Sequence, residues 1–292
     1  MLRHPNYLFL TVTVLVLACV LEARADDKAY FVTYDHRTEE PGFLEIGYNP
    51  LFGFPDKAPA FFGGLLEIGY GVKPWWTTEL YLDHQYTFGD RGALTGFRVE
   101  NRFRPFLTEY PINPVFYIEY ARLNEADRAF REVTGHSDLD ELEDPISHLK
   151  EETEHELEMK LILSSDYKGW NFAENLITEK NLTRGPWKFG YSAGLSRPLQ
   201  LAASPDPCRL CPENIMLGAE LYGGLGDHRA FGWSETAHYL APIVLWKFAD
   251  NASFRVSPGI GLTDTSVPLL LRFGVLFEMP ARGDRPLMHG VH

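Results

Sequence analysis

This chain of 292 residues has few cysteines, a shortage of basic side chains and a single long uncharged run. The uncharged run, residues 7–21, is too short to cross a bilayer as a helix, so the chain is not a helical membrane protein. Only 27 Lys and Arg stand against 40 Asp and Glu, and no basic patch offsets the net charge of −13, which argues against nucleic acid as a partner. The aromatic content of 14% is too high for an acidic disordered chain.

The uncharged run has the features of an export signal. Arg3 precedes it, and Ala23-Arg24-Ala25 follows it with the small-x-small pattern of a signal peptidase site. We therefore predict that residues 1–25 are a cleaved signal peptide and that the mature protein is exported. A lipoprotein signal using Cys19 is a less favoured alternative, because the residues before that cysteine fit such a signal poorly.

Removal of the signal peptide leaves two of the three cysteines, Cys208 and Cys211. In an exported protein, two thiols this close are expected to form a small loop disulfide. A redox site would need a helix after the first cysteine, zinc would need two further ligands, and covalent haem would need a histidine where Pro212 stands. We therefore predict a structural disulfide, and no metal or cofactor.

Residues 42–278 read as about twelve strands whose polarity alternates with a period of two. In residues 76–83, Trp, Thr, Leu and Leu share one face, whereas Thr, Glu, Tyr and Asp share the other. Residues 97–104 place Phe97, Val99 and Phe103 opposite a face that carries three arginines and a glutamate. Charged faces that recur on strand after strand, opposite large apolar faces, predict a closed antiparallel up-and-down barrel with a polar lumen and a lipid-facing exterior.

The connections between these strands predict how the chain is organised. Residues 26–41 are expected to be a leader in the periplasm, and residues 279–292 a C-terminal extension. Residues 123–153 are expected to form a long outer loop. Most of the negative charge lies in this region, because residues 122–158 have a net charge of −9. A solvated loop is the favoured interpretation, and weak bridging to lipopolysaccharide phosphates by divalent cations is a further hypothesis.

The signal peptide, the alternating strands and a final strand with outward Leu269, Leu271, Phe273, Val275 and Phe277 resemble those of Gram-negative outer-membrane β-barrel proteins. The resemblance covers nearly the whole mature chain. It implies location in the outer membrane, contact with lipid and lipopolysaccharide, and a monomeric barrel. One departure is that 15 residues follow Phe277, whereas such proteins usually end on the aromatic residue of the last strand.

The charged residues of the expected lumen are the candidate functional residues. Three arginines lie together on one expected strand. The carboxylates and two further arginines lie mostly on other strands. They are Arg98, Glu100, Arg102, Arg104, Glu45, Glu67, Glu79, Asp83, Glu119, Glu154, Glu156, Glu158, Glu220, Arg255 and Arg272. Arginines on one wall and carboxylates on another could form a selectivity filter at a constriction. Alternatively, ion pairs across a narrow lumen could close it.

The favoured function is a narrow passive pore for small solutes, or a structural barrel with a charged lumen. One alternative is an outer-membrane hydrolase that uses His84, His228 or His238 with nearby Asp or Ser234, although the sequence has no Gly-x-Ser-x-Gly and no His-Glu-x-x-His motif. Another is a soluble, exported lipocalin-like or β-sandwich binding protein, which would turn the charged faces outward.

Overall fold

The computed structural model describes residues 28–128, 146–149, 153–204, 208–233 and 235–281. The predicted signal peptide and most of the acidic loop lie outside the described residues, as does most of the C-terminal extension. Within the described residues, no helix is long and apolar enough to cross a membrane.

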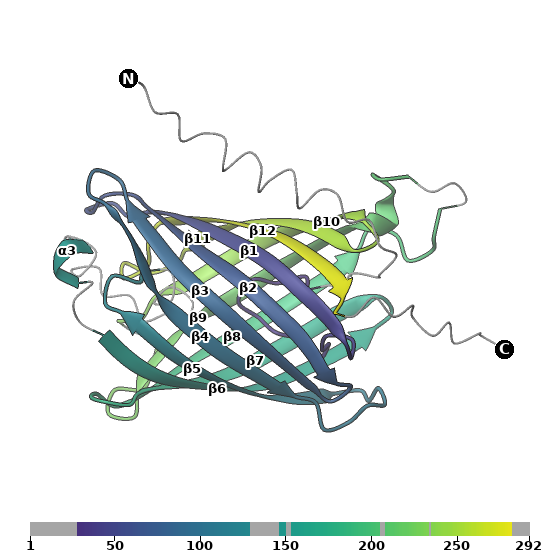
Figure 1. The fold of residues 1–292 in the computed structure, drawn as a ribbon, viewed down its shortest axis with the longest axis horizontal. Helices are drawn as coiled ribbons and strands as arrows, with labels where there is room; N and C mark the ends of the chain where they lie inside the picture. The colour runs from purple at the N-terminus through teal and green to yellow at the C-terminus, as the bar shows by residue number, and fades with distance from the viewer. Residues whose placement is uncertain (1–27, 129–145, 150–152, 205–207, 234, 282–292) are drawn as a thin grey trace, which may run out of the picture.

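Twelve antiparallel strands form one closed barrel in which each strand pairs with its neighbours in the chain and β1 pairs with β12 (Figure 1). The strands are β1 (Phe43–Phe54), β2 (Phe61–Lys73), β3 (Trp76–Thr87), β4 (Gly92–Phe103), β5 (Asn113–Asn124), β6 (Thr153–Tyr167), β7 (Trp170–Asn181), β8 (Trp187–Pro198), β9 (Ile215–Asp227), β10 (His238–Ala249), β11 (Ala252–Gly261) and β12 (Leu269–Pro280). The expected fold class and strand count are confirmed.

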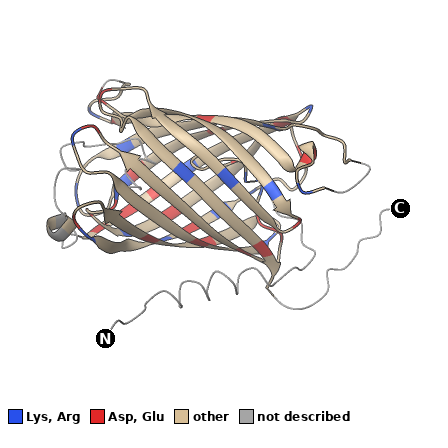
Figure 2. Cartoon of the chain, turned by 90° about the horizontal axis from the view of Figure 1, so that it is seen from above, with Lys and Arg blue, Asp and Glu red and all other residues tan. Residues whose placement is uncertain are grey.

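Burial alternates along the strands as the period-two pattern requires. In β3, Thr77, Glu79, Tyr81 and Asp83 are buried, whereas the intervening residues are partly or fully exposed. The buried faces of all strands point into the lumen, because the sheet closes on itself and leaves no other interior. Lys, Arg, Asp and Glu therefore lie in rows on neighbouring strands of the barrel wall (Figure 2).

The outer face of the barrel is apolar. Large exposed hydrophobic residues occupy the outward positions of many strands; they include Leu80, Leu82, Ile118, Phe172, Leu176 and Val244. Aromatic side chains lie close to strand ends, as Trp75, Trp170 and Trp187 do, where a membrane barrel has its interfacial girdles. The soluble alternative is wrong, because it requires the charged faces to point outward.

The connections differ between the two ends of the barrel. At the terminal end, where β1 begins and β12 ends, three of the connections contain only two residues each (74–75, 168–169 and 250–251). Lys168 and Gly169 both have positive φ, as a two-residue hairpin of type I′ demands. The two longer connections at this end are residues 104–112 and 199–214. The second of them contains the 3-10 helix η2 (Pro212–Asn214) and the disulfide between Cys208 and Cys211.

The loop end, opposite the terminal end, carries the longer connections. The β5–β6 connection holds the short helix α3 (Ile146–Leu149), which lies outside the barrel mouth at the left of Figure 1. The backbone N–H of Ile146 donates to Asp90 Oδ2 at 2.8 Å, so this part of the loop is attached to the β3–β4 turn. Short turns at the end with both termini are typical of the periplasmic side of outer-membrane barrels.

The apolar exterior predicts how the protein behaves in cells. We expect the mature chain to sediment with outer membranes, to require detergent for extraction, and to migrate faster on a denaturing gel before boiling than after, because a closed barrel resists detergent until it is heated. Comparison with a soluble periplasmic protein in the same fractions provides the control. Release of this chain into aqueous buffer would contradict the membrane assignment.

Candidate functional site: the charged lumen

The lumen contains a stretch of chain that precedes the barrel. Residues 28–41, called here the inner segment, contact lumen-facing side chains of β1, β2, β3, β6, β7, β9 and β11. Ala29, Tyr30 and Val32 are almost fully buried. This differs from the expectation that residues 26–41 form a leader in the periplasm. The physical reason is that the polar lumen offers partners to the backbone and the polar side chains of this segment.

Two polar side chains of the wall hold the backbone of the inner segment. The carboxylate of Glu220 on β9 accepts hydrogen bonds from the N–H groups of Phe31, Val32 and Thr33 at 2.7, 2.8 and 2.7 Å. Asn175 on β7 accepts from the N–H of Tyr34 at 2.7 Å and donates to its carbonyl oxygen at 2.8 Å. Bonds from N–H groups to a carboxylate are among the stronger kinds of hydrogen bond, so Glu220 is the main backbone anchor.

Lys28 neutralises a cluster of buried carboxylates near the terminal end. Its Nζ lies 2.9 Å from Glu67, 3.0 Å from Glu79 and 3.1 Å from Glu39, and it also forms an ion pair with Glu45. Lys28 lies outside the strands; burial lowers its pKa, but the four carboxylates together raise that pKa well above its ordinary value. The ammonium group is therefore the cation that makes the burial of these acids tolerable.

The same carboxylates have the spacing of an oxygen-ligand metal site. One oxygen from each of Glu45, Glu67 and Glu79 lies within 4.8 Å of the others, and Glu39, Glu45 and Glu278 form a second such group. Hard cations such as Ca²⁺ prefer oxygen ligands of this kind. In this structure the Lys28 ammonium contacts all three carboxylates of the first group, and Arg102 also contacts Glu79.

Arg102 continues the network along the wall. It forms ion pairs with Glu79 on β3 and, at 2.9 Å, with Glu100 on its own strand β4. The Glu100 carboxylate also accepts hydrogen bonds from the hydroxyls of Tyr81 at 2.6 Å and Tyr34 at 3.1 Å. Strand residues and an inner-segment tyrosine are thus joined in one buried network.

The other ion pairs also form along the wall rather than across the lumen. Arg98 on β4 binds Asp83 on β3 through two hydrogen bonds of 3.1 and 2.7 Å, and Glu119 on β5 lies 3.9 Å away. Lys160 on β6 pairs with Glu158 of the same strand at 2.9 Å. These residues lie on the same strand or on neighbouring strands. Their charges are therefore neutralised within one part of the wall, and not by side chains of the opposite wall.

β11 and β12 form a basic part of the wall. Arg255 donates to the carbonyl oxygens of Lys28, at 3.0 Å, and Tyr30, and to Asn49 Oδ1 at 3.0 Å. The guanidinium of Arg272 lies 5.3 Å from the ring centre of Tyr222. Among the described residues, neither arginine forms an ion pair with a carboxylate, in contrast to Arg98 and Arg102.

Two of the remaining candidates lie away from this network. Glu156 faces the lumen near the loop end and is buried. Arg104 does not continue the basic row, because β4 ends at Phe103; its side chain donates to Glu109 at 2.6 Å and to the Phe106 carbonyl at 2.8 Å. Side chains alternate between the two faces only within the strand. The sequence pattern was extended one residue beyond the end of β4, and it therefore wrongly predicted that Arg104 lies in the lumen.

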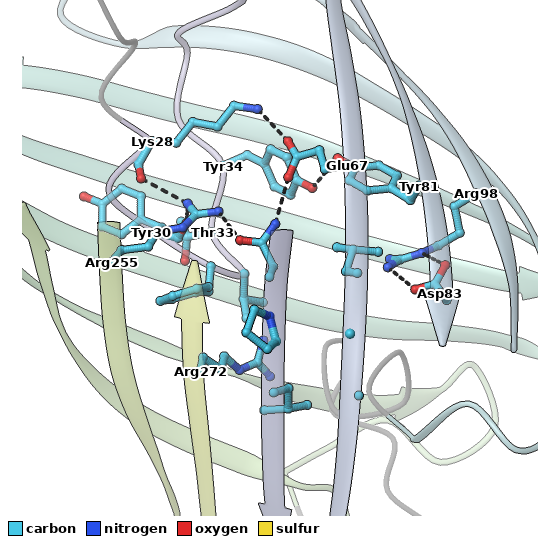
Figure 3. A pocket seen from close by; sticks show the side chains of 18 of the residues that line it. Lys28, Tyr30, Thr33, Tyr34, Glu67, Tyr81, Asp83, Arg98, Arg255 and Arg272 are labelled. Atoms are coloured by element: carbon cyan, nitrogen blue, oxygen red, sulfur yellow. Dashed lines mark hydrogen bonds and ion pairs between the residues drawn. The ribbon is translucent and has the colours of Figure 1, made fainter. Parts of the chain in front are cut away.

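A cavity of about 110 Å³ lies between the inner segment and the wall (Figure 3). Its charged lining includes Glu67, Asp83, Arg98, Arg255 and Arg272. In the close-up, Lys28 and Arg255 lie at one side of this space and the Arg98–Asp83 pair lies at the other. Seven of the fifteen lumen candidates, from both the acidic and the basic parts of the wall, therefore lie around one space, and the inner segment narrows this space.

Two of the three histidines considered for hydrolysis, His84 and His238, make other contacts. His84 is hydrogen-bonded to Tyr48 at 3.2 Å, and His238 to Tyr191 at 3.1 Å and Thr236 at 2.9 Å. In the described parts of the chain, no Ser or Asp side chain is hydrogen-bonded to the ring of His84 or His238. Ser234 lies outside the described residues.

One Ser–His–carboxylate group went unrecognised in the sequence. His36 of the inner segment contacts Ser164 Oγ through Nδ1 at 2.8 Å and Glu109 through Nε2 at 3.0 Å. Ser164 and His36 are each 2% exposed, and none of the three residues lines the cavity. A nucleophile needs space for a substrate beside it, so this group attaches the inner segment to the terminal end instead.

The sequence does contain a signal for the inner segment. Residues 237–247 are apolar on both faces, which is unusual for a strand beside a polar lumen. The inward residues of β10 include Ile243 and Leu245, which pack in one buried cluster with Ala29 and Tyr30. A lumen face that is apolar on one strand indicates that another part of the chain covers it.

Comparisons with known proteins agree on the fold. No protein-family model matches the chain, and no curated protein matches it in sequence. Among solved structures, it is similar to the KdgM porin, with 8% identity, coverage of 80% of this chain and 98% of that one, and a TM-score of 0.50. A second structure of that porin, in complex with disordered oligogalacturonate, matches with 9% identity, the same coverage and the same TM-score.

Omp33 from Acinetobacter baumannii matches with 9% identity, 81% and 97% coverage and a TM-score of 0.38. The two matches to the KdgM porin and the closed sheet of twelve strands show that the chain has the fold of Gram-negative outer-membrane β-barrels. This fold and the apolar outer face place the protein in the outer membrane, as the sequence predicts.

We predict that Lys28→Met destabilises the folded barrel. Among the described residues, the substitution leaves Glu45 and Glu67 without an ion pair, whereas Glu39 and Glu79 keep Arg102. Loss of one partner of a buried ion pair typically costs about 3–5 kcal/mol. The free energy of unfolding in urea, measured in lipid vesicles, tests this. Arg91→Met is the control: its ion pair with Asp90 is largely exposed, so a change within about 0.5 kcal/mol is expected. Equal stability of Lys28→Met and the wild type would show that Lys28 does not neutralise the cluster.

Proposed function

We propose that this protein is a narrow passive pore of the outer membrane, and that the inner segment forms its constriction. Small solutes are its cargo, and outer-membrane lipid and lipopolysaccharide surround it as a monomer. A barrel of about twelve strands has room for a narrow channel. Here the inner segment occupies much of that room.

The way in which the inner segment is held carries the proposal. Its only backbone pairing with the wall, among the described residues, is at its end, where Pro41 bridges Gly71 and the adjacent Gly42 N–H donates to the Gly71 carbonyl at 2.8 Å. Its other described attachments to the wall are hydrogen bonds and ion pairs that involve side chains, such as Glu220 and Asn175, together with apolar packing of Ala29, Tyr30 and Val32. A segment held in this way can shift without breaking a sheet, whereas a structural filler would gain more from pairing as a further strand.

The charged lining supports passage of water and polar solutes. The cavity of about 110 Å³ already separates the inner segment from part of the wall, and both acidic and basic side chains border it. In the proposed mechanism, movement of the inner segment toward the terminal end would connect this cavity to the rest of the lumen and so form a continuous passage. Polar groups in a pore lining replace part of the hydration shell of a solute.

Single-channel recording in planar lipid bilayers tests the proposal. We expect small conductance steps for the wild type and a larger open population for Glu220→Gln, which weakens three hydrogen bonds to the inner segment. A loss of about 1.4 kcal/mol of anchoring would raise that population about tenfold.

Glu174→Gln is the matched control. Glu174 precedes Asn175 on β7 but faces outward, so the same chemical change should leave the conductance at the wild-type level. The absence of conductance steps from both the wild type and Glu220→Gln would favour a closed structural barrel and overturn the pore.

A further inference from the structure

The guanidinium of Arg272 differs from the other arginines of the lumen. Arg272 is 6% exposed and lines the cavity, and its Nε and Nη2 have no hydrogen-bond acceptor among the residues that the structure describes. Figure 3 shows it below the ion-paired residues, and no hydrogen bond or ion pair joins it to them. A buried charge without a partner is costly, and its donors remain available to a ligand.

Two neighbouring side chains have free donors as well. Ser257 lies opposite Arg272 in the β11–β12 register and is fully buried. Arg255 lies two residues before Ser257 on the same face of β11. Within the described part of the chain, the Ser257 hydroxyl has no hydrogen-bond partner and the Arg255 Nε has no acceptor. A side chain at Gly274 would come within 2.7 Å of that Nε, so the glycine there preserves the space beside Arg255.

The positive charges of Arg255 and Arg272 are not compensated by nearby carboxylates among the described residues. The acceptors of Arg255 are neutral carbonyl and amide oxygens, and the carboxylate of nearby Glu67 is already paired with Lys28 at 2.9 Å. Two guanidinium groups on adjacent strands therefore face the cavity without a carboxylate partner among the described residues. A planar guanidinium fork matches the two oxygens of a carboxylate.

We propose that the β11–β12 wall binds a small organic carboxylate, with Arg272 as its principal ligand and Ser257 and Arg255 as further donors. The cavity lining near Arg272 also includes the apolar residues Val32 and Leu51, so the acid carries a short apolar tail. A cavity of about 150 Å³ accommodates benzene. A space of about 110 Å³ therefore suits an acid of about five heavy atoms, such as propionate.

The route by which the acid reaches this site rests on the proposed pore, whereas binding itself does not. Isothermal titration of the purified barrel in non-ionic detergent with sodium propionate therefore tests the site directly. We expect saturable binding of propionate and none of propionamide, which has the same shape without the charge. Arg272→Gln should weaken propionate binding about tenfold or more, and Arg272→Lys should weaken it less, because lysine keeps the charge and loses the fork.

Arg91→Gln is the control for net charge; it lies in the β3–β4 connection at the loop end and should bind propionate as the wild type does. Equal binding of propionate and propionamide overturns the proposal. So does unchanged affinity in Arg272→Gln, or binding of inorganic phosphate in place of propionate. If Arg272→Gln does not fold, the propionate–propionamide comparison and Arg272→Lys still decide. Conductance without propionate binding would overturn the proposed carboxylate site and support the proposed pore. Propionate binding without conductance would support the site and overturn the pore.

Discussion

Neutralisation of buried carboxylates by Lys28 is the interaction on which the arrangement of the lumen depends. Glu45, Glu67 and Glu79 come from three consecutive strands and face the same space. Like charges on adjacent strands repel one another, and the barrel wall shields them from bulk water. A cation must therefore lie among them, and the chain supplies it from the segment just before β1. The position of Lys28 in turn brings the rest of the inner segment into the lumen.

The lumen has two chemically different sides, and the inner segment matches both. Toward the early strands it presents polar groups, including the Tyr34 hydroxyl near Glu100. Toward β9, β10 and β12 it presents Ala29, Tyr30 and Val32 to apolar side chains. On the acidic side, the described ion pairs join residues of one strand, of neighbouring strands, or of the wall and the inner segment. Much of the charge on this side is thus neutralised locally, and a selectivity filter stays a prediction. On the basic β11–β12 wall, by contrast, the charges of Arg255 and Arg272 are not neutralised by carboxylates among the described residues.

The strands of the barrel could be predicted because their signal is local. In residues 97–104, each inward charge lies two positions from the next, and the pleat of a strand places such residues on one face whatever the rest of the chain does. The same local rule explains why the predicted position of Arg104 was wrong. The alternation of polar and apolar residues does not indicate where a strand stops pairing with its neighbour. The disulfide between Cys208 and Cys211 was also predictable, because only three positions separate the two residues in the sequence.

By itself, the sequence determined a closed barrel of about twelve strands with apolar residues toward lipid and charges inside, because alternation, turn spacing and composition are encoded residue by residue. Only the tertiary structure decided what fills the lumen and which charges are paired. Lys28 meets Glu79 across 51 positions, and Arg255 meets the backbone of Tyr30 across 225. Contacts at such separations arise from the closure of β1 on β12 and from the path of the inner segment, and no local pattern contains them.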